Sequence, residues 1–267
     1  MEKLVYMDNN ATTRMSNEVF EAMKPYFTEI YGNASSKFYK TGRLAEAALV
    51  GFRERVAKQF GVRPNEIYFT ASGCEADNWA IKGIADAYRD KGNHIITSSI
   101  EHHAILGACE FMEKHGFEVT YLPVDEKGRV NPADVEAAIT DKTILISVMT
   151  ANNEIGTIEP ICEIAKIAKA HGIVMHTDAV QAMGHMRVNV PELGVDMLSV
   201  SAHKFHGPKG VGLLYIRNGV RISNLIHGGG QERGKRAATE NLAGIAGMCT
   251  ALEIANKNLD ANVAKMT

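Results

Sequence analysis

Short apolar runs alternate along this chain with longer segments in which apolar residues recur at helical spacing. Runs of this length, bounded by turn-forming residues, are typical of strands. We predict strands at 66–70, 94–98, 118–122, 143–149, 173–177, 196–200 and 212–216. Asn131 before Pro132 indicates one helix start, and Pro160 and Gly172 bracket another helix. Because strands and helices alternate, we expect an α/β fold with a mainly parallel sheet and helices on both faces.

The last part of the chain has a different pattern. From Thr239 onward apolar residues recur at helical spacing, and no helix-ending signal follows Gly247. We therefore expect one large domain at residues 1–250. Residues 251–267 are expected to begin a helix that links to a further C-terminal domain outside this sequence.

Composition argues against several classes of protein. The formal net charge is −2 with the signs interspersed, which gives no basic surface for nucleic acid. No apolar run approaches the roughly 18 residues of a membrane span, and the N-terminus lacks a signal-peptide pattern, so we expect a cytoplasmic protein. Cysteines 74, 109, 162 and 249 lie far apart, so neither a zinc site nor a disulfide framework is indicated, and no metal is expected.

Lys204 is the first candidate for chemistry. It follows the predicted strand 196–200 on a Ser-Ala-His-Lys turn, with His203 beside it and His206 two residues on. An amine that attacks a carbonyl must be partly neutral, and burial or nearby positive charge lowers its pKa to make it so. The alternative interpretation is an ordinary solvated lysine.

Other strand ends carry polar or small residues of the kind that bind ligands. Gly73 and Cys74 follow one strand where a helix begins, and amide groups at a helix start can bind a phosphate. Asp178 ends another strand, with Gln181 shortly after it; Asp178 is either a helix cap or the partner of a cationic ring nitrogen. His102 follows a third strand and is either a satisfied polar residue or a functional one.

The amide pair at 152–153 follows a fourth strand, and a glycine-rich basic loop spans 227–241. That loop is either solvated or faces a phosphate. An amine, a ring-nitrogen acid, amide donors, a histidine and a phosphate seat together match the requirements of pyridoxal phosphate. The combination is far more specific than any single member.

At this point the chain resembles the NifS/IscS-type cysteine desulfurases, which are class V aminotransferases with the aspartate-aminotransferase fold (fold type I). The resemblance covers essentially the whole chain, and its motifs are 6–13, 31–36, 100–104, 152–156, 176–181 and 201–210. It implies that residues 1–250 are the pyridoxal-phosphate-binding large domain. It also implies that residues 1–20 pack on the further C-terminal domain.

The resemblance also implies roles for individual residues. Lys204 resembles the Schiff-base lysine and His102 the histidine that stacks on the cofactor ring and moves protons. Asp178 is similar to the ring-nitrogen partner, and Asn153 and Gln181 to the amides near the phenolic oxygen. The residues that match phosphate-binding positions are Gly73, Cys74, Ser201, His203 and Thr239, the last contributed across a homodimer.

The chain departs from the family in two respects. Cys74 stands where the family often has threonine, and a thiol is the poorer hydrogen-bond donor. We expect backbone amides to bind the phosphate there, with some loss of affinity, and the other three cysteines to be small buried residues. The resemblance also places the sulfur-accepting cysteine and a substrate-binding arginine beyond residue 267.

The implied function is a transferase that converts L-cysteine to L-alanine and an enzyme-bound persulfide for iron–sulfur cluster assembly, with a scaffold protein as sulfur acceptor. By itself the chain is expected to turn over little or no cysteine. Two alternatives remain open. One is a selenocysteine lyase or β-eliminating enzyme on the same cofactor, and the other is a non-catalytic fragment that dimerises.

Overall fold

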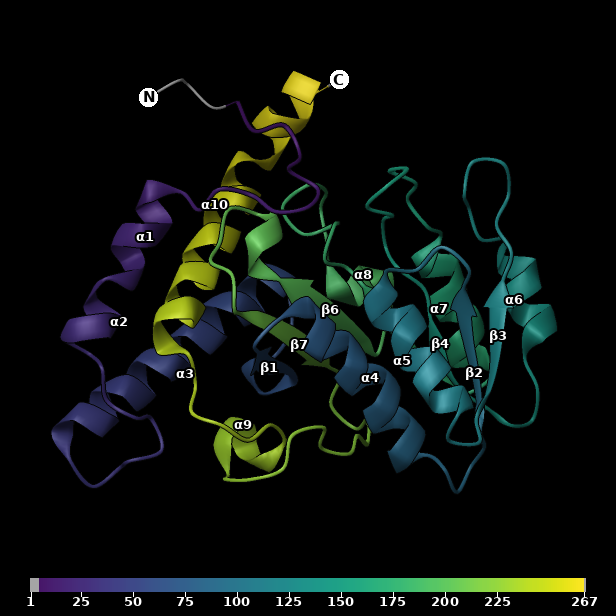
Figure 1. The fold of residues 1–267 in the computed structure, drawn as a ribbon, viewed down its shortest axis with the longest axis horizontal. Helices are drawn as coiled ribbons and strands as arrows, with labels where there is room; N and C mark the ends of the chain where they lie inside the picture. Colours follow the sequence, from purple (N-terminus) through teal and green to yellow (C-terminus); the bar gives the residue numbers. More distant parts are fainter. Residues whose placement is uncertain (1–4, 267) are drawn as a thin grey trace.

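The computed structural model describes residues 5–266, so residues 1–4 and 267 of the two expected segments lie outside the described residues. The described chain forms one sheet of seven strands in the order β1-β7-β6-β5-β4-β2-β3 (Figure 1). The strands are β1 (Ile67–Thr70), β2 (His94–Ser98), β3 (Glu118–Leu122), β4 (Thr143–Ser147), β5 (Val174–Asp178), β6 (Met197–Ser201) and β7 (Gly212–Ile216). The apolar runs therefore predicted the strands correctly, within a residue or two at their ends.

Strand β7 is the exception to the parallel arrangement. It pairs antiparallel with β1 on one side and with β6 on the other, whereas the remaining neighbours are parallel. The mainly parallel sheet is thus confirmed. Because β1 and β6 both run against β7, their carboxyl ends lie at the same edge, where Thr70 and Ser201 each pair with Gly212.

Helices cover both faces of the sheet. Helices α4 (Gly73–Ala87) and α5 (His103–Glu113) pack on one face, and α3 (Lys40–Phe60), α7 (Ile161–Ala170) and α10 (Leu242–Met266) on the other (Figure 1). Shorter helices are α1 (Asn17–Met23), α2 (Pro25–Thr28), α6 (Pro132–Ala138), α8 (Val190–Leu193) and α9 (Gln231–Gly234), with 3-10 turns at Pro64–Glu66 and Ala202–Lys204.

The two apolar cores follow from the alternation of side chains along each strand. Ile95 of β2 and Leu145 of β4 lie in the core under α4 and α5, whereas Ile96 and Ile146 lie in the opposite core. Each central strand is therefore apolar at consecutive positions, as expected for a sheet buried on both faces. Among the described residues, no helix is both long and apolar enough to cross a bilayer.

Helix α10 runs without a break through the boundary expected at residue 250. The N-terminal segment crosses this helix above the sheet and continues into α1, which packs on α10 (Figure 1). The Thr13 backbone N–H and hydroxyl both donate to the His203 carbonyl oxygen, at 2.9 and 2.8 Å. The start of the chain is therefore attached to the turn that carries Lys204, and its packing on a further domain stays a prediction.

Candidate active site

The carboxyl ends of β1, β5 and β6 meet at one edge of the sheet. Asp178 is the last residue of β5, Ser201 is the last residue of β6, and the turn after β1 leads directly into α4. Ligands of open α/β sheets bind at this edge. The fold therefore brings together candidate residues that the sequence separates by more than a hundred positions.

The turn between β1 and α4 forms an anion seat. The Ser72 hydroxyl caps α4 by accepting the Glu75 N–H at 3.0 Å, which leaves the N–H groups of Gly73 and Cys74 pointing out of the helix start. Gly73 is needed for close packing, because a Cβ there would lie 2.8 Å from the Val180 side chain and 3.2 Å from Ser201 Cβ. The Ser201 side chain thus lies beside two free amide donors.

Lys204 lies half-buried on the 3-10 turn after β6. Its amine donates to the backbone carbonyl oxygens of Asn10 and, at 3.1 Å, Ala11. Burial lowers the pKa of Lys204, while the negative charges of Asp178, Asp8 and Glu154 act in the opposite direction. The amine is therefore closer to its neutral form than an ordinary surface lysine is.

Residues 8–13, which we call the N-terminal strap, connect several candidates. The Asn10 carbonyl oxygen also accepts from Gln181 Nε2 at 3.0 Å, and Asn10 Nδ2 donates to the Asn153 carbonyl oxygen at 3.1 Å. Thr12 Oγ1 lies 3.1 Å from His203 Nδ1. The sequence assigned no role to Asn10 or Thr12; the run of polar residues inside the 6–13 motif was the signal that could have pointed to them.

Asp178 is buried, and its carboxylate accepts the Val180 N–H at 2.8 Å. No helix begins here, because a turn follows β5, so the helix-cap interpretation of Asp178 is wrong; the contact closes a local turn and leaves the second interpretation open. Burial raises the pKa of Asp178, whereas the Val180 N–H and the positive charges of His102 and Lys204 act to lower it. The pKa of Asp178 is raised overall, and a further positive charge beside the carboxyl group would favour its ionised form.

Further buried titratable groups lie beneath the site, and no sequence pattern indicated them. Burial raises the pKa of Asp77 on α4 well above its usual range, and the neighbouring Asp178 raises it further. Burial also raises the pKa of Glu101 to about 8, although Ser98 Oγ and the Met149 N–H donate to its Oε1 at 2.6 and 2.9 Å. His176, fully buried between two serines, has its pKa lowered to about 3 by burial and stays neutral.

His102 and Asn153 lie at neighbouring carboxyl ends. His102 is the exposed N-cap of α5, and its Nδ1 accepts the Ala104 N–H at 3.1 Å, so a neutral ring carries its proton on Nε2. Asn153 is half-buried, with its side chain 2.7 Å from Glu154 Oε1. Within the described chain Thr239 joins none of these groups; it is exposed on the loop after α9.

The cysteines only partly match expectation. Cys109 and Cys249 are buried, as predicted, and burial raises the pKa of each thiol to about 12. Cys162 was expected to be buried but is exposed, because it lies on the outward side of α7, whose residues Ile161 and Ile164 face the core. Cys74 is exposed at the anion seat. In the described residues, no group of three histidine, cysteine or acidic side chains could hold a metal ion.

Comparison with known proteins agrees with this geometry. The aminotransferase class-V family pattern matches residues 5–266. The cysteine desulfurase IscS of Clostridium botulinum (strain Hall) is 59% identical over 267 residues, which is all of this chain and 67% of that protein. The chain thus spans about two thirds of that relative's length.

Solved structures show the same likeness. A NifS-like protein superposes with a TM-score of 0.95 at 45% identity, covering 97% of this chain and 71% of that one. A structure described as SspA in complex with cysteine superposes with a TM-score of 0.90 at 40% identity, covering 94% of this chain and 72% of that one. Both the fold and the sequence therefore lead to one conclusion: the chain belongs to the class-V aminotransferases and, within them, to the IscS-type cysteine desulfurase family.

Proposed function

We propose that this chain carries the cofactor site of a pyridoxal-phosphate-dependent cysteine desulfurase. The enzyme would convert L-cysteine to L-alanine while a thiol takes up the sulfur as a persulfide. The observation that supports this most is the meeting of a half-buried amine, Lys204, and a buried carboxylate, Asp178, beside the free amides of the α4 start.

The donor set fits pyridoxal phosphate group by group. The N–H groups of Gly73 and Cys74, the Ser201 hydroxyl and His203 would hold the phosphate at the positive end of the α4 dipole. Asp178 is a buried acid whose ionised form a neighbouring positive charge would favour, so it suits a protonated ring nitrogen. Lys204, with its lowered pKa, suits the aldehyde.

When bound, the cofactor supplies an electron sink for the carbanion formed at the substrate α-carbon. The residues of this chain bind, orient and move protons around it. The Lys204 amine is positioned by the strap carbonyls and can accept a proton once it is neutral. His102 offers Nε2–H on the exposed side of its ring, because its Nδ1 is committed to the Ala104 N–H. Asn153 and Gln181 would supply amide donors near the phenolic oxygen.

None of the four cysteines in this sequence is proposed as the sulfur-accepting thiol. A thiol must ionise to attack sulfur, and Cys109 and Cys249, with pKa values raised to about 12, stay protonated. Burial, together with Asp77, also raises the pKa of Cys74, which occupies the anion seat. Cys162 lies on α7 with its thiol 3.6 Å from the Glu192 carbonyl oxygen, away from the Lys204 turn.

We also propose a cytoplasmic homodimer that passes sulfur to an iron–sulfur scaffold protein. The exposed loop that carries Thr239 supports the dimer, because it is fixed beside the anion seat. Arg236 Nε donates to Glu75 Oε1 at 2.7 Å, and Glu75 is adjacent to Cys74. A threonine presented outward from so fixed a position suits the phosphate of a second copy.

Spectroscopy of the purified chain tests this function. With pyridoxal phosphate, the wild type is expected to give a visible absorbance band that changes when L-cysteine is added. Lys204→Ala is expected to lose that band, whereas Lys209→Ala, an exposed lysine five residues on, keeps it. A wild-type chain that stays colourless at saturating cofactor contradicts the proposal. Pyruvate instead of alanine as product would favour the β-eliminating alternative.

A further inference from the structure

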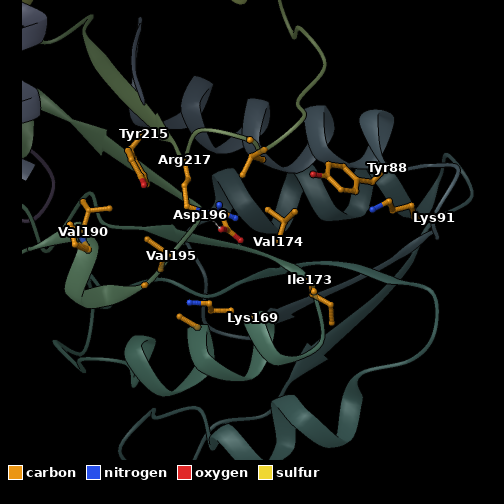
Figure 2. Close-up of a pocket in the computed structure, with 16 residues that line it drawn as sticks. Tyr88, Lys91, Lys169, Ile173, Val174, Val190, Val195, Asp196, Tyr215 and Arg217 are labelled. Carbon is orange, nitrogen blue, oxygen red and sulfur yellow. Dashed lines mark hydrogen bonds and ion pairs between the residues drawn. The ribbon is translucent and has the colours of Figure 1, made fainter. Parts of the chain in front are cut away.

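A cavity of about 450 Å³ lies at the opposite edge of the sheet from the candidate active site (Figure 2). Val174, the first residue of β5, and Asp196, just before β6, line it. Asp178 and Ser201 end the same two strands, and strands of five residues are about 16 Å long. The cavity is therefore separate from the residues assigned to the cofactor. Its volume is within the usual range of small-molecule sites.

The cavity lining is positively charged. Lys91, Lys169 and Arg217 line it against the single carboxylate of Asp196 (Figure 2). Arg217 is held in place, because its Nε donates to Asp196 Oδ1 at 2.6 Å and its backbone N–H donates to the Asp196 carbonyl oxygen at 2.8 Å. Asp196 in turn accepts the Met175 N–H at 2.9 Å. An arginine fixed in this way loses little conformational entropy when it binds a ligand.

The guanidinium group of Arg217 retains binding capacity. Only its Nε is used by Asp196, and within the described residues its two terminal nitrogens make no hydrogen bond. The Arg217 side chain is 55% exposed, so these nitrogens are accessible. A planar guanidinium with two free amino groups suits a carboxylate or a phosphate.

Tyr215 of β7 supplies an independent observation. It is only 4% exposed and lines the cavity, yet no described residue gives its hydroxyl a hydrogen-bond partner. Figure 2 shows the hydroxyl turned toward the space between Val190, Val195 and Arg217. The oxygen is not among the fully buried polar atoms of the described chain, so it is accessible from the cavity and can bind a ligand atom or a water there. Burial raises the pKa of Tyr215, which keeps the hydroxyl a neutral donor.

Much of the remaining wall is apolar and includes Ile173, Val174, Val190, Val195 and Val220, beside the amphipathic side chain of Tyr88. These side chains are largely buried in the fold, and the small apolar area that they present to the cavity would stay in contact with water beside an inorganic anion, whereas a neutral molecule would leave the cations unused. We propose that this cavity binds a small organic anion, with its carboxylate or phosphate on Arg217 and Tyr215 and its apolar body against the valines. Lys91 and Lys169 lie at the rim and attract the charge.

Ligand-observed NMR tests this proposal with benzoate and phenyl phosphate as probes, and with benzyl alcohol and inorganic phosphate as comparisons. The protein is first loaded with pyridoxal phosphate to occupy the candidate active site, and unbound cofactor, which is itself an aromatic anion, is removed before the probes are added. Both aromatic anions are expected to bind, and benzyl alcohol is not. Arg217→Gln and Tyr215→Phe are each expected to weaken binding at least about fivefold, as loss of a hydrogen bond to a charged group predicts.

Arg221→Gln is the matched control. Arg221 lies 5.0 Å from the Tyr88 ring but does not line the cavity, so its loss should leave binding unchanged. Tyr215→Phe keeps the Arg217–Asp196 ion pair, so it still tests the cavity if Arg217→Gln fails to fold. Equal binding in wild type and both cavity variants overturns the proposal, as does the absence of binding at millimolar probe. Inorganic phosphate binding as tightly as phenyl phosphate would show an adventitious ion only and also overturns it.

Discussion

The Lys204 amine lies 3.1 Å from the carbonyl oxygen of Ala11, a residue 193 positions earlier in the chain. The residue proposed to react is therefore positioned by the N-terminal strap as well as by its own turn. Backbone carbonyl oxygens accept hydrogen bonds and carry no net charge. They therefore mainly orient the Lys204 amine and have less effect on its protonation. Loosening the strap should weaken the cofactor site without removing any proposed cofactor ligand.

Thr13→Ala tests the strap. The buried Thr13 hydroxyl donates to the His203 carbonyl oxygen at 2.8 Å and accepts the His206 N–H at 2.7 Å. Its loss should lower the free energy of unfolding by about 1–3 kcal/mol and weaken cofactor binding. Ser16→Ala, which removes the cap of α1, should cost about 1 kcal/mol and leave cofactor binding unchanged. Equal cofactor affinity in Thr13→Ala and wild type, measured by titration, would contradict this role.

Glu101→Gln should change how stability depends on pH. The folded protein holds a proton on Glu101 up to about pH 8, whereas the unfolded chain releases it near pH 4.5. The stability of the wild type therefore falls as pH rises from 4.5 to 8. A neutral glutamine avoids this loss and keeps an oxygen for the Ser98 and Met149 donors. Its advantage should be near zero at pH 4.5 and reach at most roughly 4–5 kcal/mol above pH 8.

Urea unfolding of the cofactor-free protein at pH 5 and pH 9 checks this pH prediction. Glu110→Gln, on the exposed side of helix α5, which begins two residues after Glu101, is the control and should shift stability by no more than about 0.5 kcal/mol at either pH. If the free energy of unfolding differs between Glu101→Gln and the wild type by the same amount at both pH values, burial does not keep Glu101 protonated.

Glu232→Ala should be strongly destabilising. Arg53 donates to both Glu232 oxygens, at 2.8 and 2.6 Å, and Glu232 also accepts the Phe69 N–H on the outer edge of β1 at 3.0 Å. The Glu232 side chain is 1% exposed, so its removal takes the ion-pair partner from a buried guanidinium that keeps its hydrogen bond to the Ile67 carbonyl oxygen, and should cost about 3–5 kcal/mol.

The exposed pair Arg187–Asp260 provides the control for Glu232. Its side chains are 79% and 77% exposed at a separation of 2.7 Å, so Asp260→Ala should cost no more than about 1 kcal/mol in urea unfolding. Comparable losses in the two variants would mean that the buried pair does not anchor the loop that leads to Thr239.

Cys74→Thr should tighten cofactor binding. A hydroxyl at this position of the anion seat donates a stronger hydrogen bond than the thiol, and a gain of about 0.5–1.5 kcal/mol corresponds to roughly 2–12-fold in Kd. Cys162→Thr changes an exposed residue of α7 and should leave the cofactor Kd measured by titration unchanged. An unchanged or weaker affinity in Cys74→Thr would contradict a side-chain hydrogen bond from position 74 to the phosphate.

The sequence predicted the strands because most of them are short runs buried on both faces; the edge strand β3 is the partly exposed exception. It predicted site residues because polar residues at strand ends converge wherever strands are parallel. It could not give the direction of β7, since an apolar run such as 212–216 has no polarity that distinguishes the two directions. Nor could it show that Asp77 is buried, because a single acid in a helix is ordinarily solvated.

The strap shows a second limit of sequence-based prediction. Asn10 meets Gln181 across 171 positions, and no local pattern in a polar coil encodes so distant a contact. Only the resemblance pointed to the 6–13 motif, without assigning roles within it. The contacts became evident from the fold, which places the strap over the turn that carries Lys204.

Peptide mapping after borohydride reduction tests the central claim most directly. The chain is incubated with pyridoxal phosphate, reduced, digested and analysed by mass spectrometry. We predict a single stoichiometric modification, on the Lys204 side chain. Stoichiometric labelling of any other lysine, with Lys204 unmodified, would contradict the assignment of this edge of the sheet as the cofactor site.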